Sequence, residues 1–566
     1  MPTPPADQES ERDAIADVLI VGYGPVGQLL AVLLARHGWQ VIVLERWPQP
    51  FSLPRAVGFD SEAGRILAAA GIGDAFADFG EPSREYAWRN ARGETLIEFD
   101  VAERGHCSWP DSTSFYQPAL EAELIARGAG MPNLRVLRGH TVVDSIDDHE
   151  GVALIADTPE GTRRTFRGSW VIGCDGANSF VRDRIGTTTT DLGFARDWLI
   201  CDVTLRESRE FKPNNLQICD PARPRTAVSA GPGHRRWEFM RLPGEQVSDF
   251  GKVENAWRLL GLVDVTPENA QLDRHAVYTF RASWTDSWRS GRMLVAGDAA
   301  HVMPPFAGQG MCSGFRDAAN LAWKLDLVLA GRADAAVLDT YVSERRAHVQ
   351  HAVSMSVELG KVVCVVNPAA AADRDAAMLT ARSRNIEPSA MERTAVKSLV
   401  TGFLRHDADG RPAKHAGDST PQARVARDGR TGLFDELVGL GFVLITTADV
   451  TSLLGERELE SLAATDTTLV RVRPAGTDPG DLAEHDVVDV DGAYLPYLAG
   501  MGAVAALVRP DFYLFGVAAD EAELRDLVRD AADRLVAAPA LSGRAASRFR
   551  QPCADGSVRI RRGARR

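Results

Sequence analysis

The segment between Ala16 and Arg46, ADVLIVGYGPVGQLLAVLLARHGWQVIVLER, constrains the fold of this chain more than any other. It contains two apolar runs, residues 18–21 and 41–44, which have the pattern of buried parallel strands. Between them lie three glycines in the spacing G-x-G-x-x-G and a helical pattern with leucines on one face. A strand, a glycine turn, a helix and a second strand in this order predict a parallel α/β unit.

Each glycine of this turn has a separate physical task. Gly22 makes the tight turn, Gly24 lets a pyrophosphate approach the backbone, and Gly27 lets the helix pack closely against the strand. The helix N-terminus attracts the anion, and the acid after the second strand can accept a hydrogen bond from a ribose hydroxyl. The segment therefore predicts a dinucleotide site rather than a merely structural glycine turn. The expected contacts are Gly22, Gly24, Pro25, Val26, Gly27, Glu45 and Arg46.

Two later segments indicate which dinucleotide binds. In WVIGCDGANSFVRDRIG, residues 170–186, Asp175 follows an apolar strand and either faces the ligand or only caps the next helix. In GRMLVAGDAAHVMPPFAGQG, residues 291–310, Asp298 lies at the carboxyl end of another strand, where open α/β sheets bind ligands. The bare backbone that follows suits the pyrimidine edge of a flavin, which is negatively charged when reduced. These segments favour FAD, with contacts at Asp175, Gly297, Asp298, Pro305, Gly308, Gly310 and Met311.

Composition and charge argue against several other classes of protein. A net charge of −13 over 566 residues disfavours a general nucleic-acid binder and adsorption to anionic lipid. No apolar run approaches the ~20 residues that span a bilayer, and the polar start of the chain lacks the pattern of a signal peptide. The seven cysteines are scattered singly, without C-x-x-C or metal-ligand spacing, so we expect no bound metal and a cytoplasmic location.

The three motifs, in this order, resemble those of the class A flavoprotein monooxygenases, and the resemblance extends from Ala16 to about Val363. PRAVGFDSEAGRIL, residues 54–67, looks like the corresponding segment of the phenol-hydroxylating branch. FYQPALEAEL, residues 115–124, supplies Gln117, which is a flavin contact in that family. CDPARPRTAVSAGPGHRRWEFMRLPGE and DTYVSERRAHV are most similar to segments of 3-(3-hydroxyphenyl)propionate hydroxylases.

The resemblance implies a reaction. A family member binds one FAD, takes electrons from NADH or NADPH as a transient co-substrate, and uses dioxygen to form a flavin C4a-hydroperoxide that hydroxylates a phenolic ring. The expected partner is therefore a small aromatic molecule, with a hydroxyphenylpropionate-like acid as one candidate. One nucleotide fingerprint in the sequence agrees with a nicotinamide that has no Rossmann domain of its own.

The resemblance and the patterns together predict an α/β fold with three parts. We expect a mobile tail at 1–15, an FAD-binding domain at 16–186 and 284–363 with substrate-domain insertions near 75–110, and an antiparallel substrate sheet at 187–283. A linker at 364–425 and a thioredoxin-like domain at 426–566 follow, the latter without C-x-x-C and therefore without dithiol chemistry. We expect this last domain to serve packing or the contact of a homodimer.

Roles for single side chains come from the same resemblance. Arg55 is expected to hold the flavin or its phosphates, and the backbone at Pro305 and Gly310 to steady the flavin during catalysis. The predicted substrate contacts are Val57, Ser114, Trp237 and Phe239. Val57 stands where some relatives carry a base, so the phenol base stays open among Asp60, His106, Ser114 and Glu238. A substrate carboxylate has candidate partners in Arg225, Arg235, Arg236 and Arg241, whereas His301 and Cys312 are expected to be structural.

Three alternatives to a catabolic phenol hydroxylase stay open. The first is a flavin monooxygenase that tailors a polyketide or modifies an aromatic antibiotic, since the FAD motifs do not report the size of the pocket. The second is a flavoprotein reductase that does not use oxygen, which the P-P-x-x-G-Q-G segment disfavours. The third is a flavin-binding module without enzymatic activity.

Overall fold

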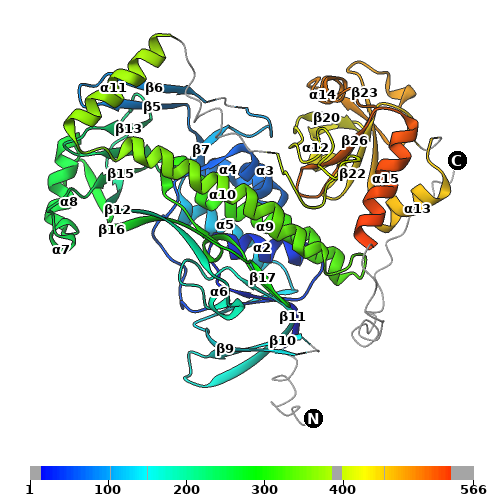
Figure 1. Cartoon of the computed structure of the whole chain (residues 1–566), viewed down its shortest axis with the longest axis horizontal. Coiled ribbons are helices and arrows are strands. Elements are labelled where there is room, and N and C mark those ends of the chain that lie inside the picture. Colours follow the sequence, from blue (N-terminus) through cyan, green and yellow to red (C-terminus); the bar gives the residue numbers. More distant parts are fainter. Residues whose placement is uncertain (1–14, 102–103, 149–150, 385–397, 451–452, 537–566) are drawn as a thin grey trace.

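The computed structural model describes residues 15–101, 104–148, 151–384, 398–450 and 453–536, and the predictions for 1–14 and 537–566 lie outside this range. Figure 1 shows the C-terminal part, coloured yellow to red, on one side of the remaining chain. The long helices α9 (Gln309–Leu329) and α10 (Val337–Val363) extend towards it. The described strands form four sheets, two of which make the predicted nucleotide and substrate layers.

The first sheet contains the predicted parallel unit. β1 pairs in parallel with both β2 and β11, and the order β17-β18-β11-β1-β2-β8 places β1 near the middle. Every residue of β2 is buried, as expected for a strand covered on both faces. The strands are β1 (Ile15–Val21), β2 (Val41–Glu45), β8 (Leu134–Arg138), β9 (Thr141–Asp148), β10 (Gly151–Asp157), β11 (Arg163–Gly173), β17 (Arg289–Ser290) and β18 (Met293–Val295).

Helices cover this sheet and bring their N-termini to its carboxyl edge. α2 packs against α5 and α9, and the close contact of α2 with α9 depends on glycine. A Cβ on Gly314 would lie 2.5 Å from Cγ2 of Val26. The helices of this part, besides α9 and α10, are α2 (Pro25–Arg36), α3 (Ser61–Ala69), α4 (Phe76–Phe79), α5 (Gln117–Ala129) and α6 (Phe180–Ile185).

The second sheet has two buried faces. Its strands follow the order β19-β16-β12-β15-β14-β13-β5-β6, and every pairing is antiparallel except β13 with β5. One face packs against α7 (Val247–Phe250) and α8 (Val253–Leu260), and the other, which we call the inner face, joins the main core. The strands are β5 (Glu85–Asn90), β6 (Thr95–Asp100), β12 (Thr189–Leu205), β13 (Asn215–Cys219), β14 (Arg225–Ser229), β15 (His234–Met240), β16 (Ala270–Thr285) and β19 (His301–Val302).

A small sheet connects these two layers. β3 (Gly58–Asp60) and β4 (Gly80–Pro82) both pair with β7 (Ser112–Phe115), so the segment after β2 is held beside the start of α5.

The C-terminal part has its own sheet, ordered β21-β20-β24-β23-β22-β25-β26. β22, β23 and β24 are parallel, while β25 and β26 form an antiparallel hairpin. The strands are β20 (Arg424–Arg427), β21 (Arg430–Leu433), β22 (Val443–Thr446), β23 (Thr468–Arg473), β24 (Asp486–Asp489), β25 (Ala505–Val508) and β26 (Leu514–Ala518). The helices are α12 (Phe434–Val438), α13 (Glu456–Ala464), α14 (Tyr494–Met501) and α15 (Glu521–Val536).

The segment predicted as a linker contains a helix. α11 (Pro368–Ser383) is capped by Asn367, whose side chain accepts from the amides of residues 369 and 370. Arg374 donates to the carbonyl of Cys219, and Arg382 to that of Thr95, so α11 is tied to the edge of the second sheet. Among the described helices, none alone is long and apolar enough to cross a membrane; α10 and α11 meet such a criterion only as a bent pair.

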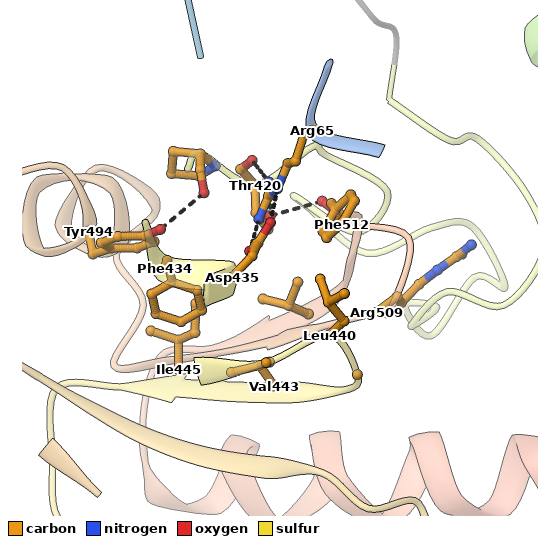
Figure 2. A pocket seen from close by; sticks show the side chains of 14 residues that line it. Arg65, Thr420, Phe434, Asp435, Leu440, Val443, Ile445, Tyr494, Arg509 and Phe512 are labelled. Carbon is orange, nitrogen blue, oxygen red and sulfur yellow. Dashed lines mark hydrogen bonds and ion pairs between the residues drawn. The ribbon is translucent and has the colours of Figure 1, made fainter. Parts of the chain in front are cut away.

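A buried ion pair joins the C-terminal part to α3. The guanidinium of Arg65 forms two hydrogen bonds with Asp435, of 2.7 and 2.8 Å, and Nη1 donates to the carbonyl of Thr420. The same guanidinium lies 4.0 Å from the ring centroid of Phe512. Figure 2 shows Arg65 inserted among these C-terminal side chains. The residual cavity around them is about 10 Å³, so the interface is closely packed.

A second buried cluster joins the C-terminal part to α9 and α10. Arg509 binds Glu344 of α10 and Asp511, both at 2.7 Å. Lys324 of α9 donates to Glu344 at 2.8 Å, and Asn320 donates to both carboxylates. These side chains are almost fully buried, and burial lowers the pKa of Lys324 to about 8 although Glu344 opposes the shift. The C-terminal part is therefore docked through charged as well as apolar contacts.

We expect Arg65→Met to lower the free energy of unfolding by about 3–5 kcal/mol, because it leaves the Asp435 carboxylate inside the interface without a partner. Arg65→Met combined with Asp435→Leu should recover much of that loss. The control, Arg163→Met, removes an exposed pair with Asp157 and should change stability by less than about 0.5 kcal/mol. Urea unfolding measures all three, and equal stabilities of Arg65→Met and the control would contradict the prediction.

Candidate active site

The glycine turn after β1 has open space only where a ligand is expected. Gly22 has φ +97°, and a Cβ there would lie 2.5 Å from the carbonyl oxygen of Cys174. A Cβ on Gly27 would lie 2.2 Å from the carbonyl oxygen of Gly22, so both positions require glycine for packing. At Gly24, by contrast, no atom of the described chain lies within 4 Å of such a Cβ. α2 then begins at Pro25 without a side-chain cap, which leaves its first amides for an anion.

The acid after β2 is held beside this turn. Oε2 of Glu45 accepts from the amide of Tyr23 at 2.7 Å, and Oε1 accepts from the amide of Trp47 at 2.8 Å. Glu45 is thus fixed at the edge where a ribose would lie, and its predicted role stays a prediction. Arg46 is exposed and lies over the Trp47 ring.

Arg138 is a charged residue that the sequence patterns do not reveal. It pairs with Glu45 in the register of β2 and β8, and its guanidinium lies 5.2 Å from the ring centroid of Tyr23. Its Nη2 is buried and has no hydrogen-bond partner among the described residues. An unpaired guanidinium nitrogen next to the glycine turn fits a phosphate or ribose oxygen. Arg138 belongs to LRVLR, a strand pattern in which no motif distinguishes one arginine from the other.

A chain of amide and carboxylate groups connects Gln117 to the glycine turn. Oε1 of Gln117 accepts from the backbone amides of Arg55 and Ala56, both at 2.7 Å. Its Nε2 donates to Glu121, which also accepts from Gln28 at 2.8 Å. Burial raises the pKa of Glu121, although both amide donors oppose the shift. Gln117, predicted as a flavin contact, is thus shown to position the backbone at residues 55 and 56.

Arg55 and Asp298 are distant in sequence, but the charge of Arg55 affects the carboxyl group of Asp298. Arg55 is exposed, and its guanidinium lies 4.8 Å from the ring centroid of Phe51. The side chain of Asp298 is accessible to solvent. Nearby protein atoms partly desolvate its carboxyl group and raise its pKa. The charges of His301 and Arg55 oppose that rise. The two predicted flavin contacts are therefore near enough for their charges to interact, and Asp298 follows the carboxyl end of β18.

A buried carboxylate on α9 holds the Gly297 turn. Oδ2 of Asp317 accepts from the amide of Gly297 at 2.9 Å and contacts Nε2 of His301 at 2.8 Å. Oδ1 accepts from Nε of Arg345 on α10, also at 2.8 Å. Burial alone would raise the pKa of Asp317, but the charges of His301 and Arg345 hold it below its usual value. His301 thus has a structural contact, in agreement with the sequence-based expectation, and Gly297 has φ +60°.

The backbone from Pro304 to Met311 is open, as the flavin interpretation requires. Gly308 has φ +64° and no atom within 4 Å of a Cβ placed on it, and at Gly310 the nearest such atom is 3.9 Å away. α9 begins at Gln309 without a side-chain cap, so its first amides are available to a ligand. Cys312 is buried and donates weakly to the Gly308 carbonyl.

Asp60 serves the start of α9 and not a substrate. It accepts from Nη2 of Arg316 at 2.6 Å and from Gln309 at 3.1 Å, and its other oxygen caps α3. Burial would raise its pKa, but the charge of Arg316 keeps it below the usual value. Because the carboxylate is ionised and fully engaged, Asp60 is a poor proton acceptor for a phenol.

Asp175 accepts hydrogen bonds from Ser179 and from the amide of Val181, while Ser179 itself caps α6. Burial raises the pKa of Asp175 although these donors oppose it. The structure therefore supports the capping alternative for this segment. It also leaves Asp175 at the carboxyl end of β11, beside Gly22.

The inner face of the second sheet meets this region through Arg236. Arg236 forms two hydrogen bonds with Asp202, at 2.6 and 3.1 Å, and donates to the carbonyls of Pro54 and Arg55. In the register of β12 with β15, Asp202 pairs with Arg236, Ile200 with Glu238, and Trp198 with Met240. Glu238 therefore lies between the contact with residues 54 and 55 and Trp198, whose ring lies 5.7 Å from that of Phe306.

Glu238 is a titratable group of this face whose pKa is shifted into the neutral range. Burial raises its pKa to about 7, Asp202 adds to the shift, and the charges of Arg236 and Arg274 oppose it. Nη1 of Arg236 is 3.9 Å from its Oε1, too far for a hydrogen bond.

The structure argues against two of the predicted substrate contacts. Trp237 and Phe239 point to the opposite face and pack in the core formed with α8. The physical reason is the two-residue period of a strand, which places them on the opposite side from Arg236 and Glu238. Val57 accepts from the amide of Phe115, and Ser114 is buried opposite Gly58 in the small sheet. His106 contacts the carbonyl of Ser419 in the C-terminal part, away from this face.

The assembled residues fit FAD. The open space at Gly24, the unpaired nitrogen of Arg138, the accessible carboxylate of Asp298 and the uncapped start of α9 lie along one edge of the first sheet. A long dinucleotide could lie along that edge with its pyrophosphate at the glycine turn and its flavin ring at Pro305 to Met311.

Comparison with known proteins agrees with this geometry. Residues 15–356 match the family described as FAD binding domain, and residues 417–534 match the family described as HcaD C-terminal domain. The chain is 40% identical over 517 residues, 91% of this chain and 94% of the relative, to a probable NADH-specific resorcinol 4-hydroxylase of Rhodococcus jostii (strain RHA1). It is 30% identical over 578 residues, 92% of this chain and 97% of the relative, to a 3-(3-hydroxy-phenyl)propionate/3-hydroxycinnamic acid hydroxylase of Comamonas testosteroni.

Solved structures share the fold at lower identity. Aklavinone-11 hydroxylase, solved with FAD and aklavinone, superposes with a TM-score of 0.71 at 24% identity and covers 92% of this chain and 99% of its own. The flavin-dependent monooxygenase PieE, solved with FAD and substrate, has a TM-score of 0.76 at 21% identity and the same coverage.

The chain belongs to the FAD-dependent aromatic hydroxylases of the class A flavoprotein monooxygenase family. It is an FAD-binding monooxygenase that consumes a nicotinamide dinucleotide and dioxygen and acts on a small aromatic ring.

We expect Gly24→Ala to weaken FAD binding and leave the apoprotein as stable as before. The added methyl group meets no atom of the described chain within 4 Å, but it enters the space where the pyrophosphate would lie. The Kd for FAD should rise at least about tenfold, equivalent to about 1.4 kcal/mol. Flavin fluorescence titration and thermal unfolding of the apoprotein measure the two effects.

Gly27→Ala is the matched variant, because its methyl group collides with the Gly22 carbonyl. It should destabilise the apoprotein by about 1–3 kcal/mol. If Gly24→Ala binds FAD as the native protein does, the pyrophosphate does not lie at Gly24.

Proposed function

We propose that this monooxygenase hydroxylates a small uncharged phenol of the dihydroxybenzene type, with Glu238 as the proton acceptor for the phenolic hydroxyl. The observation that carries the proposal is the state of the inner face: Arg236 and Arg274, the arginines beside Glu238, are bound to protein partners, and the Glu238 carboxyl group has a pKa of about 7.

The four arginines considered for a substrate carboxylate all have other partners. Arg236 is bound to Asp202 and to two carbonyls, as described above. Arg225 pairs with Asp220 at 2.9 Å and Arg241 with Asp197 at 2.8 Å. Arg235 donates to Asn214 and lies 3.7 Å from the centroid of the Phe211 ring, which belongs to the core with Trp237. A substrate carboxylate would have to displace one of these partners, whereas a neutral phenol would not.

Glu238 is suited to act on a phenolic hydroxyl. A carboxyl group with a pKa of about 7 is partly ionised at neutral pH, and its carboxylate can accept the phenolic proton as the ring becomes more electron-rich. Bound FAD, once reduced by the nicotinamide, supplies the oxygen-transfer chemistry. Arg236 and Asp202 position the strand beside residues 54 and 55, and the buried Trp198, on the same face as Glu238, would limit the access of water to a bound ring.

The relatives support this substrate class in different degrees. The relative at 40% identity is named for resorcinol, an uncharged dihydroxybenzene, while those named for hydroxyphenylpropionate are 30–35% identical. The likeness to aklavinone-11 hydroxylase concerns the fold.

The test measures NADH oxidation, oxygen uptake and product mass for the holoenzyme with resorcinol, 3-(3-hydroxyphenyl)propionate and a polycyclic phenol. We expect resorcinol to accelerate both rates and to return one oxygen atom heavier, with kcat/KM at least about tenfold above that for the propionate. A preference for the propionate or the polycyclic phenol overturns the substrate proposal. NADH oxidation without any oxygenated product overturns the hydroxylase reaction itself.

We expect kcat/KM for the phenol to rise with pH and to level off above about 7, because Glu238 accepts a proton only when ionised. Glu238→Gln should lower kcat/KM by about 10²–10³ at pH 8 and remove this dependence. Glu207→Gln, at an exposed position after β12, is the control and should keep the native profile. An unchanged pH profile in Glu238→Gln assigns the proton transfer elsewhere.

We further propose that the C-terminal part is a thioredoxin-like module that serves packing. Its support is the order β23-β22-β25-β26, with a parallel β22–α13–β23 unit followed by an antiparallel hairpin and α15. We also propose the domain boundaries given under the sequence analysis, a cytoplasmic location and a homodimer.

A further inference from the structure

A groove lies between the first half of β12 and the second half of α10. It has a volume of about 470 Å³ and opens to solvent. We call it the β12–α10 groove and define it by Leu192, Phe194 and Arg196 on β12 and by Val357, Gly360 and Lys361 on α10. None of these six residues is among the predicted or described contacts of FAD or of the phenol.

Two cationic side chains line the groove and have only weak contacts with the rest of the protein. Arg196 is exposed and donates only to the carbonyl of the residue before it, with its guanidinium beside the Phe194 ring. Lys361 pairs with Glu358 one helical turn away, at 2.7 Å, and both side chains are more than 60% exposed. An exposed pair of this kind contributes little and exchanges readily for a stronger anion. Arg196 and Lys361 together outweigh Glu358, the acid that also lines the groove, so the groove favours an anion in a chain whose net charge is −13.

The inner wall of the groove is the back of the flavin-binding turn. The Phe194 ring lies 6.1 Å from the ring of Phe306, which directly follows Pro305. A Cβ on Gly360 would lie 2.8 Å from both rings, so α10 approaches them as closely as glycine allows. A ligand in the groove would therefore lie against the same short segment that is expected to hold the flavin.

We propose that the β12–α10 groove binds the nicotinamide dinucleotide, with Arg196 and Lys361 on its pyrophosphate and Phe194 against one of its flat rings. The enzyme consumes this co-substrate, but its sequence contains one G-x-G-x-x-G turn, which is expected to bind FAD. The groove combines the size of a small-molecule site, cations for the anionic pyrophosphate, an aromatic wall and contact with the flavin turn. The inference rests on nicotinamide use by the family and not on the identity of the phenol.

The test measures binding of NAD⁺ to the holoenzyme by calorimetry and the KM for NADH. We expect the double variant Arg196→Gln and Lys361→Gln to raise the Kd for NAD⁺ and the KM for NADH about tenfold. The Kd for NAD⁺ should also depend less on ionic strength than in the native protein. Glu358→Gln removes the competing acid from the same groove and should tighten NAD⁺ binding several-fold. Arg163→Gln, a remote exposed cation, should change neither value.

Two outcomes overturn the proposal. One is an unchanged Kd for NAD⁺ in the double variant while thermal unfolding shows it folded. The other is a raised KM for the phenol with an unchanged Kd for NAD⁺, which makes the groove a route for the aromatic substrate. Because the calorimetric assay contains no phenol, its result is independent of whether the dihydroxybenzene proposal holds.

Discussion

The Asp317 carboxylate is the interaction on which the arrangement of the site depends. It joins the Gly297 turn, His301 and Arg345, which come from three separate elements, and all of them are buried. A buried carboxylate with several charged and amide donors is held in one position, because moving it would leave donors unsatisfied. The Asp298 side chain and the start of α9 take their places from this anchor, and both face the expected flavin.

A second set of ion pairs relates the site to the rest of the molecule. Arg316 of α9 binds Glu62 and Asp60, so α3 and α9 hold a fixed relation near Gln309. Arg65, one helical turn after Glu62, is bound by the C-terminal part. The C-terminal part therefore contacts the helix that supports the flavin turn, although none of its residues is assigned to FAD or the phenol.

Much of the nucleotide layer could be predicted from the sequence because glycine spacing and apolar runs determine it locally. The β1–α2–β2 unit and the openness at Gly24 and Gly308 follow from which residues have no side chain. The substrate layer could not be predicted to the same degree. Six of the seven residues of β15 are buried, so their period of two separates the faces without indicating which one meets the cofactor. Trp237 and Phe239, predicted as substrate contacts, therefore lie on the other face, in the core with α8.

Ion pairs between residues far apart in the chain also could not be predicted from the sequence. Asp60 is one of four candidate bases in the sequence, and its partner Arg316 lies 256 residues later in the chain. Arg138 has no motif around it, and its importance depends on an unpaired nitrogen that only the packing reveals. The segment 364–425 was predicted as a linker, yet α11 forms there: its sequence is rich in alanine, Asn367 caps it, and two of its arginines bind carbonyls of the second sheet.

Helix α9 has a consequence for how the chain can be recombined. Its 21 residues correspond to about 30 Å of rigid helix, with the flavin turn at one end and Asn320 and Lys324 inside the contact with the C-terminal part. Because one rigid helix contacts both parts, a shift of the C-terminal part would also move the flavin turn. A chimera with the C-terminal part of a relative would therefore need to retain Asp435, Arg509 and Asp511, or to exchange α3, α9 and α10 together with that part.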